Sequence, residues 1–74
     1  MAWAGTDSLY TLTILIDGEL LLQFRDNEGA ERETHLDGRG AYALWHGPSY
    51  SHSWHTERGC TLVTIRWPVE PASP

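Results

Sequence analysis

Short stretches of alternating apolar and polar residues, separated by turn residues at intervals of about 8–12 positions, constrain the fold of this chain more than any other feature. Residues 9–16 carry large apolar side chains at every second position, which is the period of a β-strand. Asp17 and Gly18 follow, a pair that favours a two-residue type I′ turn. The same alternation resumes in residues 19–25. These two segments predict a β-hairpin.

Four further segments complete the strands that the sequence predicts. They are residues 31–36, 41–45, 50–55 and 60–67, with turn clusters at residues 26–29, 37–40, 47–49 and 56–59. The last segment is rich in β-branched residues, which favour strands. Six short strands without a helix of ordinary length predict an all-β chain, folded as an antiparallel barrel or sandwich.

The strands define one small domain. We expect a β-domain at residues 9–67, an N-terminal arm at residues 1–8 and a Pro-rich, flexible tail at residues 68–74. A chain of 74 residues builds a thin core, and its one cysteine, Cys60, excludes an internal disulfide. A metal or self-association is then the candidate source of additional stability. A cytoplasmic location is expected, because the cysteine usage fits a reducing compartment and no segment has the pattern of a signal peptide or membrane span.

The charge balance excludes two classes of partner. Asp and Glu number 10 against 5 Lys and Arg, a formal net charge of −5. Nucleic-acid and anionic membrane surfaces both require clustered basic residues, and the basic residues here are scattered. We therefore expect neither a nucleic acid nor a membrane as partner. An apolar fraction of 41% predicts a folded core rather than a disordered chain.

The histidines are the candidates for chemistry. They are His35, His46, His52 and His55. His52 and His55 are three residues apart in one expected strand, so they should point to opposite faces. His46 and His52 flank the turn at residues 47–49 and can approach each other. Zinc needs three or four ligands, so these residues alone make a weak site, and the alternative is that His46 and His55 are surface or hydrogen-bonded residues.

The tryptophans are informative about shape. Trp45, Trp54 and Trp67 lie on neighbouring expected strands. Each ring can bury a large area in a core, in a subunit interface or in the wall of a ligand cavity. In so small a fold, core or interface is favoured over ligand wall.

Three segments carry a resemblance to a known family. Residues 14–20 are similar to a strand, turn and "G-E" hairpin; Gly40 to His52 is similar to a second motif with one extra residue in its turn; and residues 60–68 are similar to the closing strand of many small bacterial members. From residue 9 to residue 68 the pattern resembles the C-terminal part of a cupin domain. The resemblance implies an antiparallel jelly-roll β-barrel that is incomplete at its N-terminus.

The resemblance also bears on metal binding. Cupins hold a divalent metal through two His and one Glu of a first motif and one His of the second, and His52 matches this last ligand. Thr11 stands at the glutamate position, and residues 4–7 contain no histidine. The cofactor is therefore left unknown. A site for Fe, Mn, Ni or Zn would be a depleted one, with His46 and His55 joining His52.

The function implied by the resemblance is the binding of a small molecule in the barrel cavity. His52 is then the proton-transfer residue of a non-redox isomerase, cyclase or lyase, and Tyr50, Trp54 and His46 bind the substrate. Two alternatives stay open. One is a metal-dependent oxygenase or isomerase that uses His52, His46 and His55, completed between subunits. The other is a non-catalytic sensory or structural module.

The missing N-terminal strands imply a partner. Their absence would leave the barrel with an open side, and exposed strand edges and apolar walls need cover. We therefore expect a homodimer or higher oligomer, in which a neighbour's sheet closes the opening. Trp3, Trp45, Trp54 or Trp67 would lie in the contact.

Overall fold

The computed structural model describes residues 3–69, and in that range the chain is all-β, as predicted. Its strands are β1 (Leu9–Asp26), β2 (Glu31–Asp37), β3 (Tyr42–His46), β4 (Tyr50–His55) and β5 (Cys60–Pro68), with the 3-10 helix η1 (Gly47–Ser49) between β3 and β4. All strand pairs are antiparallel. No helix in this range has the length and apolar character needed to cross a membrane.

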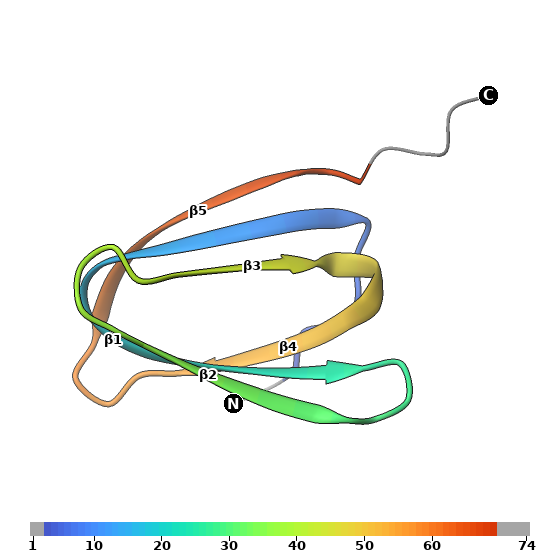
Figure 1. Cartoon of the computed structure of the whole chain (residues 1–74), viewed down its shortest axis with the longest axis horizontal. Coiled ribbons are helices and arrows are strands. Elements are labelled where there is room, and N and C mark those ends of the chain that lie inside the picture. The colour runs from blue at the N-terminus through green and yellow to red at the C-terminus, as the bar shows by residue number, and fades with distance from the viewer. Residues whose placement is uncertain (1–2, 70–74) are drawn as a thin grey trace.

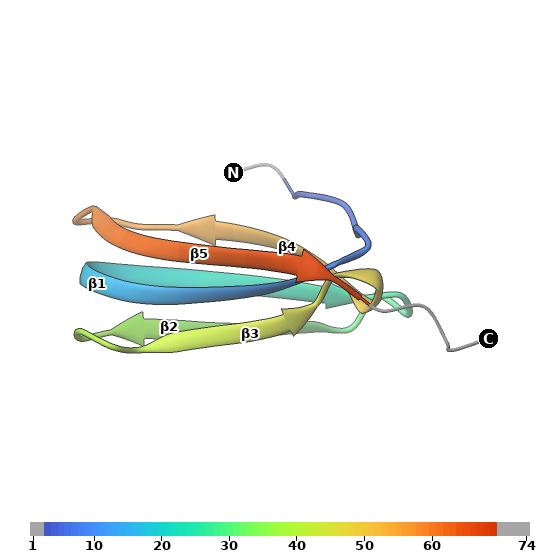
Figure 2. The same cartoon turned by 90° about the horizontal axis from the view of Figure 1, so that it is seen from above.

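The strand β1 organises the molecule because it belongs to two sheets. Its first half pairs with β3 and β5, and its second half pairs with β2 and β4. Figure 1 shows the two halves as upper and lower layers joined by a bend, and Figure 2 shows β4 and β5 on one side of β1 with β2 and β3 on the other. The result is a pair of facing three-stranded sheets, with β1 at the centre of each, that do not close into a barrel.

The predicted hairpin at Asp17 and Gly18 is wrong. These residues lie inside β1, where the pairing with β5 shifts register between Leu15 and Asp17 and Gly18 has a φ of +88°. A positive φ serves a bulge that bends a strand as well as a turn that reverses it. The bend gives each half of β1 two neighbouring strands instead of one, so residues 3–69 form five strands rather than the six expected.

The other predicted strands are confirmed to within one residue at each end, and the segment at 50–55 has the bounds expected. The arm also contributes, because Ala4 forms a bridge to the outer edge of β4: its amide donates to the His52 carbonyl at 2.7 Å and its carbonyl accepts from the His52 amide at 3.0 Å. Pro68 is the last residue of β5. The flexible tail was expected at residues 68–74, and residues 70–74 of it lie outside the described residues.

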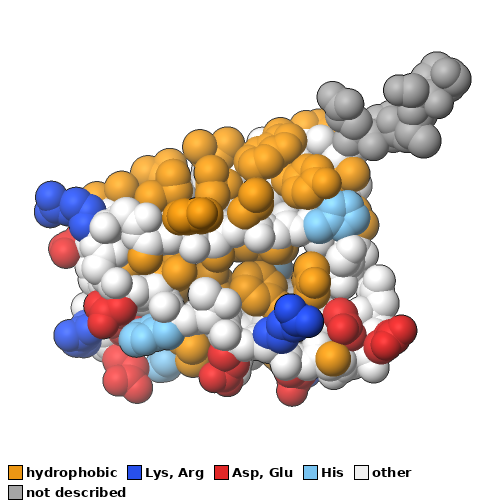
Figure 3. Space-filling view, viewed as in Figure 1, with side chains coloured by type: hydrophobic (Ala, Val, Ile, Leu, Met, Phe, Trp, Pro, Cys, Tyr) orange, Lys and Arg blue, Asp and Glu red, His pale blue; other side chains and the backbone are white. Residues whose placement is uncertain are grey.

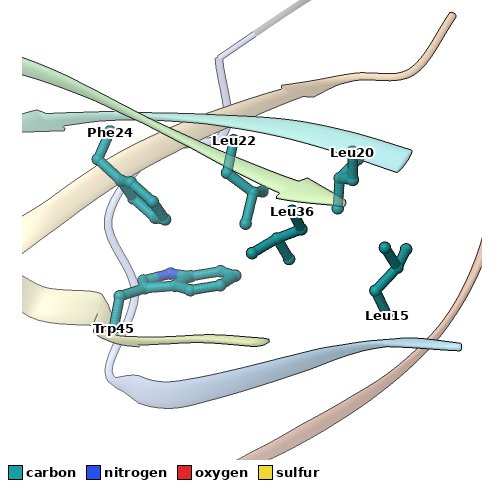
Figure 4. Packing of buried hydrophobic residues seen from close by; sticks show 6 residues of the cluster. All are labelled: Leu15, Leu20, Leu22, Phe24, Leu36 and Trp45. Atoms are coloured by element: carbon teal, nitrogen blue, oxygen red, sulfur yellow. The ribbon is translucent and has the colours of Figure 1, made fainter. Parts of the chain in front are cut away.

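A small apolar core lies between the two sheets. Figure 4 shows its side chains pointing toward one another: Leu20, Leu22 and Phe24 from the second half of β1, Leu15 from the first half, Leu36 from β2 and Trp45 from β3. The ring centroids of Phe24 and Trp45 are 5.1 Å apart. Trp45 is therefore a core residue, whereas Trp54 and Trp67 are exposed.

Candidate functional site

A cavity of about 370 Å³ lies between the sheets, on the side where β4 and β5 face each other without pairing. Its lining comes from both halves of β1 and from β3, β4 and β5: Thr11, Thr13, Leu20, Leu22, Trp45, His52, Trp54, Cys60, Leu62, Thr64 and Arg66. Apolar groups form most of this wall. The polar groups are hydroxyls, one imidazole and one guanidinium.

Strand register explains why the polar side chains of the cavity point inward. In the β2–β1–β4 sheet, His52 stands opposite Phe24, whose side chain lies in the core. In the β3–β1–β5 sheet, Arg66 stands opposite Thr11, and Thr64 opposite Thr13. Paired residues of neighbouring strands share a face, so each polar residue takes the inward direction of its partner. The hydroxyl oxygens of Thr13 and Thr64 are 3.2 Å apart and form a hydrogen bond.

His52 is held in its neutral form. Burial lowers the pKa of its imidazole below the ordinary value of 6.5, the positive charge of Arg66 lowers this pKa further, and Asp7 opposes the shift. The ring also packs against Trp45, with centroids 5.2 Å apart. A neutral imidazole has one nitrogen free to accept a hydrogen bond or a proton, so His52 can act as a base in this cavity.

The four residues predicted to bind or transform a substrate fall into two groups. His52 and Trp54 line the cavity between β4 and β5, with Trp54 exposing 49% of its surface. Tyr50 and His46 line a second hollow of about 380 Å³, which β2 and β3 border. Trp45 lies in the wall of both hollows. The structure therefore does not bring Tyr50 and His46 to the same site as His52.

The three histidines considered as metal ligands lie on different surfaces. His52 faces the cavity, and His46 bonds to Ser49 at 2.7 Å and packs its ring 5.1 Å from that of Tyr10. His55 borders a third hollow on the outside of the β2–β1–β4 sheet, so the opposite directions expected for His52 and His55 are confirmed. No group of three or more His, Cys, Asp or Glu within residues 3–69 could hold a metal ion. These residues do not fit a cupin-type metal centre.

Sequence reasoning missed the residue that gives the cavity its charge, Arg66. The strand at residues 60–67 was expected from its β-branched residues. Val63, Ile65 and Trp67 form its apolar face, and the residues between them were assigned no role. The signal was present in the sequence: Thr64 and Arg66 alternate with those apolar residues and so define a second, polar face. Which of the two faces points inward could not be read from this strand alone.

A second missed residue, Glu19, organises the loop between β4 and β5 and lies in the wall of the third hollow. Glu19 exposes only 6% of its surface. Its carboxylate accepts hydrogen bonds from the backbone amides of Glu57 and Arg58, from the Thr56 hydroxyl and from His35. These bonds lower the pKa of Glu19 from 4.5 to about 2, with the two backbone amides as the largest cause. Glu19 thereby fixes the connection from β4 to β5, the two strands that border the cavity.

The arrangement of this cavity has the features of a ligand site, since it is concave, mostly apolar and carries a few convergent polar groups. Its volume is also within the usual range for such sites, which begins at about 300 Å³. A scan against protein-family models and searches of curated proteins and of solved structures found no match to this chain.

Proposed function

We propose that this chain is a cupin-like cytoplasmic protein that binds a small organic acid in the cavity between β4 and β5. The observation that carries the proposal is the placement of Arg66, a cation on a wall to which residues 3–69 contribute no carboxylate. A guanidinium presents a planar fork of donors that matches a carboxylate in two parallel hydrogen bonds. The ligand is therefore an acid rather than an amine.

The hydroxyl groups beside Arg66 support the same ligand class. Thr11 lies opposite Arg66 on β1, and Thr64 lies two residues before Arg66 on β5. Both threonines line the same wall. Thr11 exposes only 1% of its surface, so its hydroxyl is largely shielded from bulk water. Neutral donors of this kind complete the hydrogen bonding of a carboxylate without adding charge.

The rest of the wall defines the body of the ligand. Leu20, Leu22 and Leu62 supply aliphatic surface, and Trp45 and Trp54 supply aromatic surface. Aromatic rings pack well against flat apolar groups in offset or edge-to-face arrangements. A carboxylate joined to an aromatic ring or a short hydrocarbon chain fits this combination.

Binding of benzoate and of the neutral analogue benzyl alcohol tests the proposal. Both are titrated into the full chain and followed by NMR chemical shifts and by tryptophan fluorescence, since Trp45 and Trp54 line the cavity. We expect Arg66→Gln to weaken benzoate binding at least tenfold and to leave benzyl alcohol binding unchanged. Arg39→Gln, at an exposed loop position, is the matched control. Equal benzoate affinity in the wild type and Arg66→Gln would rule out the proposed role of Arg66.

A second candidate function is proton transfer on the bound acid, with His52 as the base. The observation in its favour is the lowered pKa of His52. The imidazole is neutral beside the charged Arg66, and one of its nitrogens is free to accept a proton. In such a step His52 takes a proton from the carbon beside a carbonyl group, an enolate forms, and the same imidazole returns the proton. This chemistry belongs to non-redox isomerases and related lyases.

Deuterium exchange separates this candidate from simple binding. In D₂O, the wild-type chain should accelerate exchange of the methylene protons of phenylpyruvate, and His52→Gln should abolish the acceleration while circular dichroism stays unchanged. Binding of the acid without accelerated exchange would leave a non-catalytic sensory or structural module. A metal-dependent oxygenase or isomerase is not proposed, because the three histidines do not converge.

A further inference from the structure

The outside of the β3–β1–β5 sheet is an apolar surface with no part in the cavity. Its side chains come from all three strands and are called here the outer apolar face: Tyr10, Leu12, Ile14, Ile16, Tyr42, Leu44, Val63, Ile65 and Trp67. Figure 3 shows apolar side chains gathered along this part of the molecule, with most charged side chains over the other sheet and the loops.

Register arranges this face in ordered rows across the sheet. Leu12 stands between Leu44 and Ile65, and Ile14 stands between Tyr42 and Val63. Tyr10 stands between His46 and Trp67 in a third row. Its ring stacks on that of Trp67 with centroids 5.6 Å apart and meets the His46 imidazole edge-on at 5.1 Å. None of these row positions carries Asp, Glu, Lys or Arg.

The sheet therefore places its larger apolar side chains outside rather than inside. The inward positions of β1 in this sheet are Thr11, Thr13 and Leu15, all buried. The outward positions between them are tyrosine, leucine and isoleucine. In an antiparallel sheet that packs on one side only, the outer face is normally polar. Because the inner face is buried and the outer face is apolar, this sheet has the character of one that is covered on both sides.

The exposed area is large for a chain of this size. Six side chains of the outer apolar face expose between 38% (Trp67) and 66% (Tyr42) of their surface. This amounts to roughly 600 Å² if a large apolar side chain offers about 200 Å². Monomeric proteins rarely expose a continuous apolar patch larger than a few hundred Å². The half-buried Tyr10, Leu12 and Ile14 bring the total close to the roughly 800 Å² per partner that a standard stable interface buries.

We propose that the outer apolar face packs against the same face of a second copy of this chain, forming a two-fold symmetric dimer of facing sheets. Three observations favour a second copy as the occupant. The area is that of one side of a standard interface, the rows are uncharged and so meet a copy of themselves without repulsion, and the net charge of −5 is carried elsewhere. An anionic lipid surface would instead require basic residues around the face.

Leu12 lies near the symmetry axis of this dimer. It occupies the middle row on the central strand, and a two-fold axis between two identical faces passes near their common centre. Leu12 therefore faces the partner's Leu12. Like charges placed at this position would repel each other across the axis, and opposite charges would attract.

The experiment measures the mass of the full chain by sedimentation and light scattering from 1 to 100 μM, a range chosen to cover a dissociation constant of about 1 μM. The wild type is expected at twice its 8.4 kDa mass. Leu12→Lys and Leu12→Glu should each weaken the dimer at least 100-fold, and an equimolar mixture of the two should restore a dimer. Leu21→Lys, on the outside of the other sheet, is the control and should remain dimeric.

The mixture also tests the contact if a single variant fails to fold. In that case circular dichroism should show that strand structure returns when the two variants are mixed. A folded wild-type monomer at 100 μM would overturn the proposal and leave a different protein as the occupant of the face. A wild-type dimer whose Leu12 variants are not restored by mixing would overturn the outer apolar face as the contact.

Discussion

The backbone amide of Glu57 donates a 2.7 Å hydrogen bond to Oε1 of Glu19, and so ties the loop between β4 and β5 to the middle of β1. The Arg58 amide donates to the same oxygen at 3.1 Å. A carboxylate with two backbone donors favours its charged form. One buried acid thus fixes the spacing of the two strands that border the cavity, and its charge state makes that spacing sensitive to acid.

Acid should weaken the fold through Glu19. Its pKa is about 2 in the folded chain and 4.5 ordinarily, so its charged form contributes stability that is complete above pH 4.5 and is lost as the pH falls toward 2. Urea unfolding between pH 2 and 7, followed by tryptophan fluorescence, measures this loss. Glu19→Gln should be less stable at pH 7 and show a shallower decline below pH 4.5. The same decline in both chains would assign it to other carboxylates.

Gly18→Ala should destabilise the bend in β1. Gly18 has a positive φ, and a Cβ at this position would overlap the carbonyl oxygen of Gly59. The strained backbone and the overlap together should cost roughly 2–5 kcal/mol, which approaches the whole stability expected of so small a domain. Gly5→Ala is the control, because Gly5 has no positive φ and nothing lies within 4 Å of its added Cβ. Equal melting temperatures would show that the bend tolerates a side chain.

Leu15→Ala should unfold much of the population at 25 °C. Leu15 is fully buried between the sheets, and removing such a side chain costs about 2–5 kcal/mol through lost burial and the cavity left behind. Leu21→Ala makes the same chemical change on the outer surface of the β2–β1–β4 sheet and should cost below about 1 kcal/mol. Thermal unfolding of both variants measures the difference. Similar costs at the two positions would contradict the inward direction of Leu15.

The pKa of the His52 imidazole should lie below its ordinary value of 6.5. Because burial and Arg66 lower its pKa, the unfolded chain binds this proton more readily, and stability from His52 is present above pH 6.5 and falls as the pH drops below that value. NMR titration of the imidazole carbon-bound protons measures the pKa directly. Arg66→Gln should raise it and Arg39→Gln should not. A pKa of 6.5 or higher in the wild type would contradict the effect of burial and of Arg66 on the imidazole.

The strands were predictable because each has a local signal. The segment at residues 50–55 is bounded by turn residues at both ends, and β4 has the same bounds in the structure. The cavity was only partly predictable. His52 and Trp54 are on it, but Tyr50 and His46 border another hollow, since residues adjacent in sequence around η1 are directed to different sides of the molecule.

The sequence by itself determined most of the extended segments, which positions share a face along each strand, and that one cysteine excludes an internal disulfide. Tertiary structure alone decided that Gly18 bends β1 rather than reversing it, and that Thr11, Thr13 and Arg66 point inward while Tyr10, Leu12 and Ile14 point outward. The alternation of side chains along a strand shows which positions share a face, but it does not show which face points inward. Only the second sheet, by packing on one side, selects the face that becomes the interior.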